Sequence, residues 1–316
     1  MRLVTYNLRY DARPDNITVQ QSLAALPDPL VSPGYQRRSG DSEQPWSLRR
    51  LRVAEQLLSE GVVLAGFQEA LVRQVRDLAE LFGDDWGWVG VGRDDGVEAG
   101  EYSPIFYKKS EFLALSYDSF WTSNTPFVPS RYPGAGSHRV CTTLHLQRRH
   151  GGQKFTVLNT HLDDRSEAQR RHAASMVLAR ARYEAATAGC PVFVLGDFNS
   201  PPEGRDAGAY EIATGARAPG PLPADFAAKY AVSGAPGFAL CDLRAKVPRA
   251  AVSANHATFT GFTAPNDTRS WSRIDFIFAG GCGWEATRYK VADARADDGV
   301  LASDHRPVFA DVRISC

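Results

Sequence analysis

Residues 191–200 read PVFVLGDFNS, so that Asp197 and Asn199 directly follow a short apolar run. The length and composition of Pro191–Leu195 are typical of a buried β-strand. The two polar residues can form an Asx turn before the prolines that come next. They can also line a cleft at the end of a sheet, where α/β proteins bind their ligands. Two polar side chains one residue apart at a strand end favour the second interpretation.

Four further apolar, strand-like runs carry polar residues at or near one end. Strand ends at one edge of a sheet lie close together, so five such ends can build a single cleft. Asp275 interrupts an apolar run, where an unpaired carboxylate is costly, and we therefore expect a histidine partner for it. The polar residues at the four ends are Gln68 and Glu69, Asn159 and His161, Asp275, and Asp304 and His305.

Strand patterns alternate with helix patterns along the chain, but several strands follow one another without a helix between them. This mixture favours two packed sheets with helices outside over a strict βαβ series. We expect an α/β fold: a four-layer α/β sandwich of two packed, mostly antiparallel β-sheets flanked by helices. No linker divides the chain, so residues 1–316 are expected to form a single domain. The expected strands are 2–8, 62–67, 86–91, 103–107, 112–121, 140–147, 154–159, 191–195, 274–278, 284–291 and 307–314, and the expected helices are 48–60, 71–82 and 166–186.

Two stretches lack a clear pattern and are candidates for the rim of the cleft. Residues 11–45 are polar and contain prolines, which predicts a long surface loop or insertion. Residues 201–250 are rich in Ala, Gly and Pro and predict two short helices. Neither stretch indicates a particular substrate.

The charges of the chain are balanced, with 36 Lys plus Arg and 36 Asp plus Glu. Proteins that hold long nucleic acids usually carry a basic excess, so this balance argues against a dedicated polymer binder without excluding a local phosphate pocket. The five cysteines form no CxxC pair, and zinc or redox motifs are absent from the sequence. No apolar run is long enough to span a membrane and no signal peptide is visible, which favours the cytoplasm. We expect a monomer.

The candidate residues suit the hydrolysis of phosphate esters with the help of a hard cation. A Mg²⁺ or Mn²⁺ ion held by carboxylate oxygens neutralises the phosphate charge that repels a nucleophile. A nearby carboxylate can orient water and remove its proton, and a histidine beside a carboxylate can lie as an imidazolium next to phosphate. Because clustered Cys and His are few, oxygen ligands and Mg²⁺-like ions are favoured over zinc.

Six short motifs occur in the order typical of the endonuclease/exonuclease/phosphatase superfamily, which has the deoxyribonuclease-like fold. Each motif alone is weak, but six in this order are specific, and the resemblance spans almost the whole chain. Residues 90–107 resemble a less characterised branch of that superfamily. The motifs are Tyr6-Asn7, Gln68-Glu69, Asn159-Thr160-His161, Gly196-Asp197-Phe198-Asn199-Ser200, Arg273-Ile274-Asp275 and Ser303-Asp304-His305.

The resemblance implies a metal side and a water side of one site. Glu69 is the principal ligand of a Mg²⁺ or Mn²⁺ ion, Asn7 lies beside the metal or the phosphate, and Asp304 completes the metal side. Asp197 orients and deprotonates the attacking water, and Asn199 contacts the water or the phosphate. The implied reaction is in-line attack by water without a covalent intermediate.

Two histidines complete the machinery that the resemblance implies. His305 contacts the phosphate and is held in place by Asp275. His161 faces the leaving group, to which it donates either a proton or a hydrogen bond.

Three arginines are candidate substrate-binding residues. Several relatives carry an acidic residue at the position of Arg9, which by strand alternation shares a face with Asn7. A direct phosphate contact could replace a metal contact there, so the number of metal ions stays open. Arg93 lies in a Gly-rich loop that is either a simple turn or a substrate-selecting loop. Arg139 either reaches a phosphate or lies on the solvated surface, and Asp163 is either an active-site residue or a helix cap.

Three functions are compatible with these residues. The first, favoured by the motifs together with the zero net charge, is a phosphomonoesterase or phosphodiesterase. Its substrate would be a small phosphorylated molecule such as a sugar, nucleotide or lipid head group. The second is a nuclease on DNA or RNA, which uses the same residues and predicts a basic groove around the cleft. The third is a non-catalytic binding module, which the intact set of acids and histidines disfavours.

Overall fold

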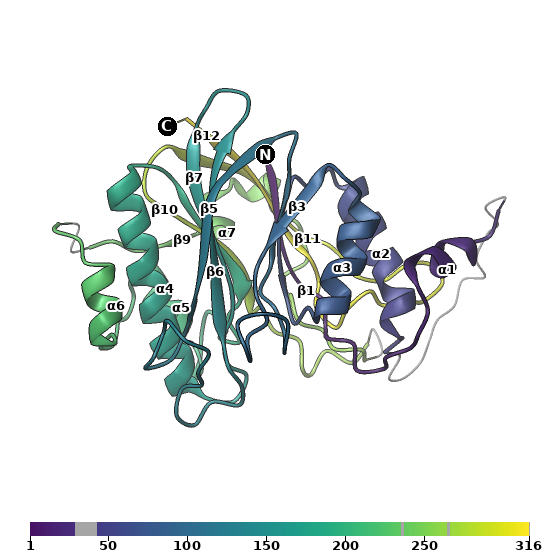
Figure 1. The fold of residues 1–316 in the computed structure, drawn as a ribbon, viewed down its shortest axis with the longest axis horizontal. Coiled ribbons are helices and arrows are strands. Elements are labelled where there is room, and N and C mark those ends of the chain that lie inside the picture. The colour runs from purple at the N-terminus through teal and green to yellow at the C-terminus, as the bar shows by residue number, and fades with distance from the viewer. Residues whose placement is uncertain (29–42, 235–236, 264–265, 316) are drawn as a thin grey trace.

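Two β-sheets pack face to face between two layers of helices in the computed structural model, which describes residues 1–28, 43–234, 237–263 and 266–315 (Figure 1). Each sheet has one parallel pair of strands in its middle, and its other neighbouring strands are antiparallel. The expected four-layer sandwich is therefore confirmed. One sheet has the order β11 (Trp284–Val291), β12 (Val308–Ile314), β1 (Arg2–Asn7), β2 (Leu64–Gln68), β4 (Ile105–Lys108) and β3 (Trp86–Val89). The other has the order β5 (Phe112–Trp121), β6 (Val140–Arg148), β7 (Lys154–His161), β8 (Val192–Asp197), β10 (Asp275–Gly280) and β9 (Cys241–Asp242).

Helices lie on the outer side of each sheet (Figure 1). Within the described ranges, none of them combines the length and the apolar character needed to cross a membrane. The helices beside the first sheet are α1 (Val19–Ala24), α2 (Trp46–Ser59) and α3 (Val72–Phe82). Those beside the second sheet are α4 (Glu167–Ala188), α5 (Gly208–Thr214) and α6 (Ala224–Lys229). The short α7 (Leu243–Lys246) follows β9, and a 3₁₀ turn at Arg249–Ala251 comes after it.

Strand β1 shows how the sequence directs polar residues into the molecule. Leu3 belongs to the core between the two sheets, whereas Val4 and Tyr6 pack in the cluster beneath α2 and α3. Successive side chains of a strand point to opposite faces, so Asn7 points toward the second sheet, on the same side as Leu3. Asn7 is fully buried there. The alternation of side chains between the two faces, as expected for this strand, is therefore confirmed from Leu3 to Asn7, the last residue of β1.

The two sheets are joined by polar groups near the strand ends that carry the predicted site. Gln68 Nε2 donates to Asn159 Oδ1 at 2.7 Å, which connects the end of β2 with β7. The close approach requires a glycine at position 66, since a Cβ at Gly66 would lie 2.8 Å from Asn159 Cγ. This contact therefore holds the end of β2, just before Glu69, against β7 two residues before His161.

Two stretches differ from the expectation. The loop predicted over residues 11–45 is wrong in part, because α1 lies within it and begins at a capping box formed by Thr18 and Gln21. Residues 29–42 of that stretch lie outside the described residues. The region 201–250 holds α5, α6, α7 and a 3₁₀ turn rather than two short helices. Helices this short show too few turns for their periodicity to be recognised in the sequence.

Candidate active site

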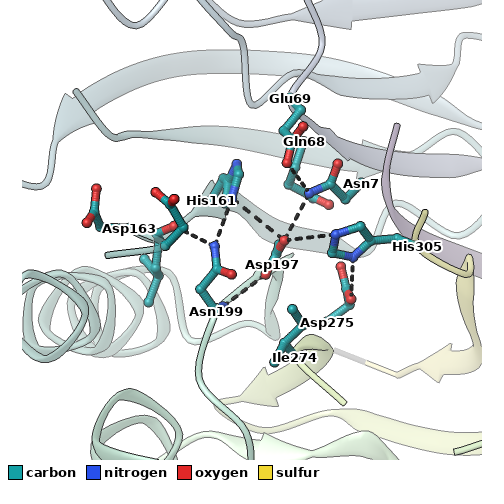
Figure 2. A network of polar contacts seen from close by, with 12 residues as sticks. Asn7, Gln68, Glu69, His161, Asp163, Asp197, Asn199, Ile274, Asp275 and His305 are labelled. Atoms are coloured by element: carbon teal, nitrogen blue, oxygen red, sulfur yellow. Dashed lines mark hydrogen bonds and ion pairs between the residues drawn. The ribbon is translucent and has the colours of Figure 1, made fainter. Parts of the chain in front are cut away.

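The strand ends of both sheets meet at one open pocket of about 770 Å³. Asn7 and Asp275 are fully buried just behind its surface, and each contacts a residue of the lining (Figure 2). The structure therefore brings together all the site residues that the sequence predicts. The predicted residues that line the pocket are Arg9, Glu69, Arg93, Arg139, His161, Asp197, Asn199, Asp304 and His305.

Asn7 links the carboxylates expected on the metal side and on the water side. Its Nδ2 donates to Glu69 Oε1 and to Asp197 Oδ2, both at 2.9 Å (Figure 2). Its Oδ1 accepts from the backbone N–H of Arg9 at 2.9 Å, which fixes the orientation of the amide. Asn7 thus holds one oxygen of each carboxylate, and backbone N–H groups of Tyr10 and Asn199 donate to the other oxygens at 3.1 and 2.9 Å.

Three residues at the site have a left-handed backbone, namely Arg9 (φ 56°), Glu69 (φ 58°) and Asn199 (φ 46°). In the described ranges, no other non-glycine residue has a positive φ. Such residues are strained, and this strain is typically found at functional sites. Because β1 ends at Asn7, strand alternation does not reach Arg9. Arg9 reaches the pocket lining through the left-handed turn. The prediction that strand alternation places Arg9 beside Asn7 is therefore wrong.

His305 is the histidine partner that the sequence predicts for Asp275. Its Nδ1 lies 3.0 Å from Asp275 Oδ2, and its Nε2 lies 3.7 Å from Asp197 Oδ2 (Figure 2). Burial alone would lower the pKa of His305, but the charge and hydrogen bond of Asp275 and the charge of Asp197 raise it well above its usual value. His305 is therefore an imidazolium at neutral pH, and both ring nitrogens can donate.

Asp197 is a buried carboxylate that titrates near neutral pH. Burial and the charge of Asp275 raise the pKa of Asp197 to about 7, although His305 opposes the shift. The backbone N–H of Asn199 donates to Asp197 Oδ1 at 2.9 Å and helps to fix the carboxylate. A group that removes a proton from water works best when its pKa lies near the working pH. Asp197 meets this condition.

The residues expected on the metal side, Glu69 and Asp304, form an acidic region in which the charge of one carboxylate acts on the other. Burial raises the pKa of Asp304, His305 opposes this shift, and the neighbouring charge of Glu69 adds to it. The nearby Arg9 already pairs with Glu43 at 3.1 Å. Clustered carboxylate oxygens of this kind are the ligands that hard divalent cations prefer. Their chemistry therefore fits a Mg²⁺-like ion.

A second, neighbouring group of possible metal ligands consists of Asp197, Asp275 and His305. One ligand atom of each lies within 4.8 Å of the others. The hydrogen bond between His305 Nδ1 and Asp275 already uses two of the possible ligand atoms. Asp197 and Asp275 Oδ1 therefore remain as possible cation ligands, whereas the protonated Nε2 of His305 can donate to a phosphate oxygen.

His161 is held in one tautomer by Asn199. The Nδ2 of Asn199 donates to Leu162 O and contacts His161 Nε2, both at 3.0 Å (Figure 2). Because an amide nitrogen only donates, His161 Nε2 is the acceptor, and the ring proton lies on Nδ1. Burial and the charges of Arg139 and Arg93 lower the pKa of His161 well below its usual value. A neutral His161 favours hydrogen bonding over proton donation, the two roles that the sequence leaves open.

The candidate arginines beyond Arg9 line the pocket but are already paired. Arg93 donates to both carboxylate oxygens of Glu101 at 2.6 and 2.9 Å, and Arg139 donates to Asp164 at 2.8 Å. Asp163 is not among the lining residues. It is fully buried, contacts Arg139 at 3.4 Å and accepts backbone hydrogen bonds from the turn before α4. Of its two alternatives, the geometry supports a structural role for Asp163 in that turn.

Sequence reasoning missed Glu101, which lines the pocket opposite His161. Its Oε2 lies 3.9 Å from His161 Nδ1. Burial raises the pKa of Glu101 to about 7, with Arg93 opposing the shift and Glu69 adding to it. Glu101 lies in a loop between β3 and β4, and no local pattern shows that this loop folds over the pocket.

Sequence reasoning also missed Arg49, a fully buried arginine of α2. Within the described residues, its guanidinium donates to five backbone carbonyls, four of which belong to the segments that carry Arg9 and Asp304. An arginine in an amphipathic helix is usually exposed, so the sequence gives no sign of this role. Arg49 connects the end of β1 with the segment before β12. The acceptors are the carbonyl oxygens of Leu8 (2.6 Å), Arg9 (3.0 Å), Tyr10 (3.3 Å), Gln44 (2.9 Å) and Ala302 (3.0 Å).

A four-layer sandwich of two six-stranded sheets with flanking helices is the architecture of the deoxyribonuclease-like class. A family model described as the Endonuclease/Exonuclease/phosphatase family matches residues 4–305. The chain therefore belongs to this family, whose members are hydrolases that act on phosphoesters.

Solved structures with the same fold cover nearly the whole chain. An endonuclease/exonuclease/phosphatase from Bacteroides vulgatus is 27% identical, with a TM-score of 0.75 over 99% of this chain and 98% of that one. The Bacteroides thetaiotaomicron mannosyl-6-phosphatase is 24% identical, with a TM-score of 0.73 over 99% and 100%. D. rerio TDP2, complexed with a single strand DNA product, is 16% identical, with a TM-score of 0.59 over 99% and 98%. No curated protein matches the chain significantly. At these identities, the last two structures show the fold alone.

Proposed function

We propose that the protein is a metal-dependent hydrolase of small organic phosphates that cleaves the ester by in-line attack of water. The observation that carries this proposal is the grouping of Glu69, Asp197 and Asp304 around the imidazolium of His305 in one pocket. The carboxylates suit a cation and a water molecule, and the imidazolium suits a phosphate oxygen. Membership of a family of phosphoester hydrolases supports the same conclusion.

Glu69 and Asp304 are the residues proposed to hold the cation, and Asn7 orients Glu69 through its hydrogen bond. When bound, Mg²⁺ or Mn²⁺ supplies positive charge at the phosphate oxygens and lowers the barrier to attack. Arg9, which follows Asn7, is proposed to contact the phosphate directly. This arrangement uses carboxylate oxygens, in agreement with the preference of such ions.

Asp197 is proposed to orient the attacking water and to accept its proton. Asn7 and the backbone of Asn199 fix the two oxygens of Asp197, so that the water meets a carboxylate in one orientation. His305 donates its Nε2–H to a phosphate oxygen while Asp275 holds the ring through Nδ1. His161 orients Asn199 and lies on the side of the leaving group. Catalysis then rests on positioning and on charge that is already in place.

A nuclease using the same residues is the alternative function. The fold does not choose between them, since it is shared by a mannosyl-6-phosphatase and by a protein solved with a DNA product. The charges of the pocket favour the small substrate, because the lining carries no excess of positive charge, with five arginines and the His305 imidazolium against six carboxylates, and a phosphate-rich polymer prefers a basic surface. The arginines are Arg9, Arg93, Arg139, Arg165 and Arg170, and the carboxylates are Glu69, Glu101, Asp164, Asp197, Asp206 and Asp304.

The test is a comparison of model substrates with and without a divalent cation. The purified protein is incubated with an aryl phosphomonoester, an aryl phosphodiester and an oligonucleotide, in Mg²⁺, in Mn²⁺ and in a chelator. We expect hydrolysis of a small ester that stops in the chelator and returns when Mg²⁺ or Mn²⁺ is restored. Cleavage of the oligonucleotide in preference to both small esters would favour the nuclease. Hydrolysis of none of the three in either cation would contradict the proposed function.

A further inference from the structure

The pocket has a second region, beside the reacting groups, where each arginine is paired with a carboxylate. Arg93 pairs with Glu101 at 2.6 Å, Arg139 with Asp164 at 2.8 Å and Arg170 with Asp206 at 3.0 Å. All six residues line the pocket. We call this region the paired wall.

The arginines of the paired wall are fixed in place, whereas two of its carboxylates are open to the pocket. The side chains of Arg139 and Arg170 are only 4% and 5% exposed, while those of Asp164 and Asp206 are 53% and 55% exposed. Arg170 is also held by a hydrogen bond from Nη1 to the backbone carbonyl of Asp163 at 3.0 Å. The wall is therefore a rigid surface on which two carboxylates are within reach of a bound molecule, beside arginines that line the pocket but are almost fully buried.

Within each of the three pairs the charges cancel, so a second anion or a cation on the substrate would find its partner there already neutralised. Arg165, which also lines the pocket, lies 3.6 Å from Asp164 Oδ2, and its side chain is 77% exposed. A hydrocarbon chain would cover the ion pairs and remove their hydration without replacing it, which is unfavourable. Among the described lining residues, the aromatic rings belong to Tyr10, which follows Arg9, and to Phe259, whose ring packs on His305. The paired wall thus offers no stacking surface for a nucleobase.

What the paired wall offers is a hydrogen-bond donor next to an acceptor, repeated three times. A hydroxyl group donates one hydrogen bond and accepts others, so it can bond to an arginine and to the carboxylate beside it at once. Neighbouring hydroxyls on one molecule can repeat this contact along the wall. Hydrogen bonds that involve charged groups are stronger than those between neutral groups. The chemistry that matches the wall best is a neutral molecule with several adjacent hydroxyl groups.

Resting on the proposed function, we infer that the substrate is the phosphate ester of a neutral polyol, such as a sugar, and that the paired wall binds its hydroxyl groups. The phosphate lies at Asp197 and His305, and the polyol is the alcohol that leaves. Arg139 with Asp164 and Arg170 with Asp206 are then specificity-determining residues.

The first test compares two esters with the same kind of primary alcohol as the leaving group, a hexose 6-phosphate and n-hexyl phosphate, both in Mg²⁺. We expect kcat/KM to be roughly tenfold to a hundredfold higher for the hexose 6-phosphate, mainly through a lower KM, because only this ester can form hydrogen bonds with the wall. A 2′,3′-dideoxynucleoside 5′-monophosphate, which has no adjacent hydroxyl groups, is expected to resemble n-hexyl phosphate. Equal kcat/KM for the hexyl and hexose esters would overturn the inference.

The second test removes one carboxylate of the wall with Asp164→Asn. The KM for the hexose 6-phosphate should rise about tenfold, and this rise should be at least severalfold greater than that for n-hexyl phosphate. The control is Glu285→Gln, which breaks the exposed ion pair with Arg313 on β11 and β12, far from the pocket lining. It should leave both KM values as in the parent. An equal loss with both esters in Asp164→Asn would mean that Asp164 has no role in specificity.

The outcomes separate this inference from the proposed function. Hydrolysis of both esters without preference contradicts the polyol inference and leaves phosphoester hydrolysis intact. If neither ester is hydrolysed, calorimetry with the same two esters in Mg²⁺ still decides, since the inference requires the hexose 6-phosphate to bind more tightly. Binding of equal strength, or none, would then contradict the inference as well.

Discussion

Two walls of the same pocket carry many charged side chains, but they arrange them differently. The reaction wall, formed by Glu69, Asp197, Asp304 and His305, gathers carboxylates with a single imidazolium among them. On the paired wall, each arginine has a carboxylate within about 3 Å. Glu101 lies between the two, since it pairs with Arg93 and also approaches His161.

The difference separates the wall that we propose to perform the chemistry from the wall that we propose to bind the hydroxyl groups of the substrate. On the reaction wall, burial and neighbouring acids raise the pKa of Asp197 and of Asp304 above their usual values. Charge left uncompensated in this way is available to a cation, a water proton or a phosphate. On the paired wall, the charges compensate one another and remain as hydrogen-bonding groups. Substitutions on the two walls should therefore have effects of different kinds and sizes.

The largest loss is expected from His305→Ala and from Asp197→Ala on the reaction wall. Removing a group that moves a proton or meets the phosphate charge should lower kcat by about 10³-fold, with any substrate. The matched control is His150→Ala, an exposed histidine in the turn between β6 and β7, which should retain the parent kcat. Steady-state kinetics with an aryl phosphate measures all three. A loss of less than about tenfold in either site variant would refute its assigned role.

Glu69→Gln should cause the next largest loss, because it removes a charged cation ligand but keeps the size of the side chain. We expect kcat/KM to fall by about 10²-fold and the Mg²⁺ concentration needed for half activity to rise. A Mg²⁺ titration of activity measures both quantities. Glu98→Gln, an exposed glutamate paired with Arg76, is the control and should titrate like the parent. An unchanged Mg²⁺ requirement in Glu69→Gln would remove Glu69 from the metal side.

Arg49→Lys should lower kcat without unfolding the protein. A lysine keeps the charge but cannot reach the carbonyls that hold Arg9 and Asp304, so the reaction wall loses alignment. Small misplacements of this kind reduce turnover by roughly 10- to 100-fold. Arg52→Lys, on the same helix and paired with Asp298, serves as the control. Thermal denaturation checks folding. A parent-like kcat in Arg49→Lys would show that the hydrogen bonds from Arg49 to these carbonyls do not position the site.

The pH profile of kcat should move when Asp275 is neutralised. The active form needs Asp197 ionised and His305 protonated, so activity rises with pH through about 7, the pKa of Asp197, and falls above the raised pKa of His305. The charge of Asp275 raises the pKa of both groups. In Asp275→Asn, the acid limb and the basic limb should therefore both shift to lower pH. Profiles measured in saturating Mg²⁺ that keep both limbs in place would contradict this coupling.

The smallest effect on turnover is expected from charges outside both walls. His145 Nε2 lies 2.7 Å from Glu184 Oε2 behind the second sheet, and this hydrogen bond is the main cause of the raised pKa of His145. The pair should stabilise the fold fully below pH about 6.5 and lose this contribution as the pH rises through the folded-state pKa. Glu184→Gln should lower the free energy of unfolding by about 2 kcal/mol and leave kcat unchanged. Denaturant unfolding at pH 6 and pH 9 measures the effect, and a stability loss that does not shrink with pH would contradict it.

The sequence predicted much of the fold and of the reaction wall because both depend on local patterns. Apolar runs followed by polar residues identified the strand ends at Glu69, Asp197 and Asn199. The cost of burying an unpaired Asp275 led to the expectation of a histidine partner, which the contact at 3.0 Å with His305 confirms. Such predictions succeed because burial and alternation act within a few residues of the chain.

The remaining features depend on how distant segments meet, so local patterns could not predict them. Arg49 has the spacing of an ordinary helix residue, and its carbonyl partners are assembled only in the folded chain. Glu101 reaches the pocket through a loop whose path no periodicity describes. The left-handed turn at Arg9 ends the alternation that the sequence extended by two residues. For α1, the signal was present, since Thr18 and Gln21 form a capping box, but a helix of six residues gives too little periodicity to support it.

The central claim is that the reaction wall directs water to the phosphorus atom with the help of a divalent cation. The most direct measurement is hydrolysis of a phosphomonoester in ¹⁸O-labelled water with Mg²⁺, followed by mass spectrometry of both products. Attack on phosphorus places one ¹⁸O atom in the released phosphate and none in the alcohol, and the reaction stops in a chelator. Label in the alcohol, or label in the phosphate that appears equally fast in the chelator or in Asp197→Ala, would contradict the account.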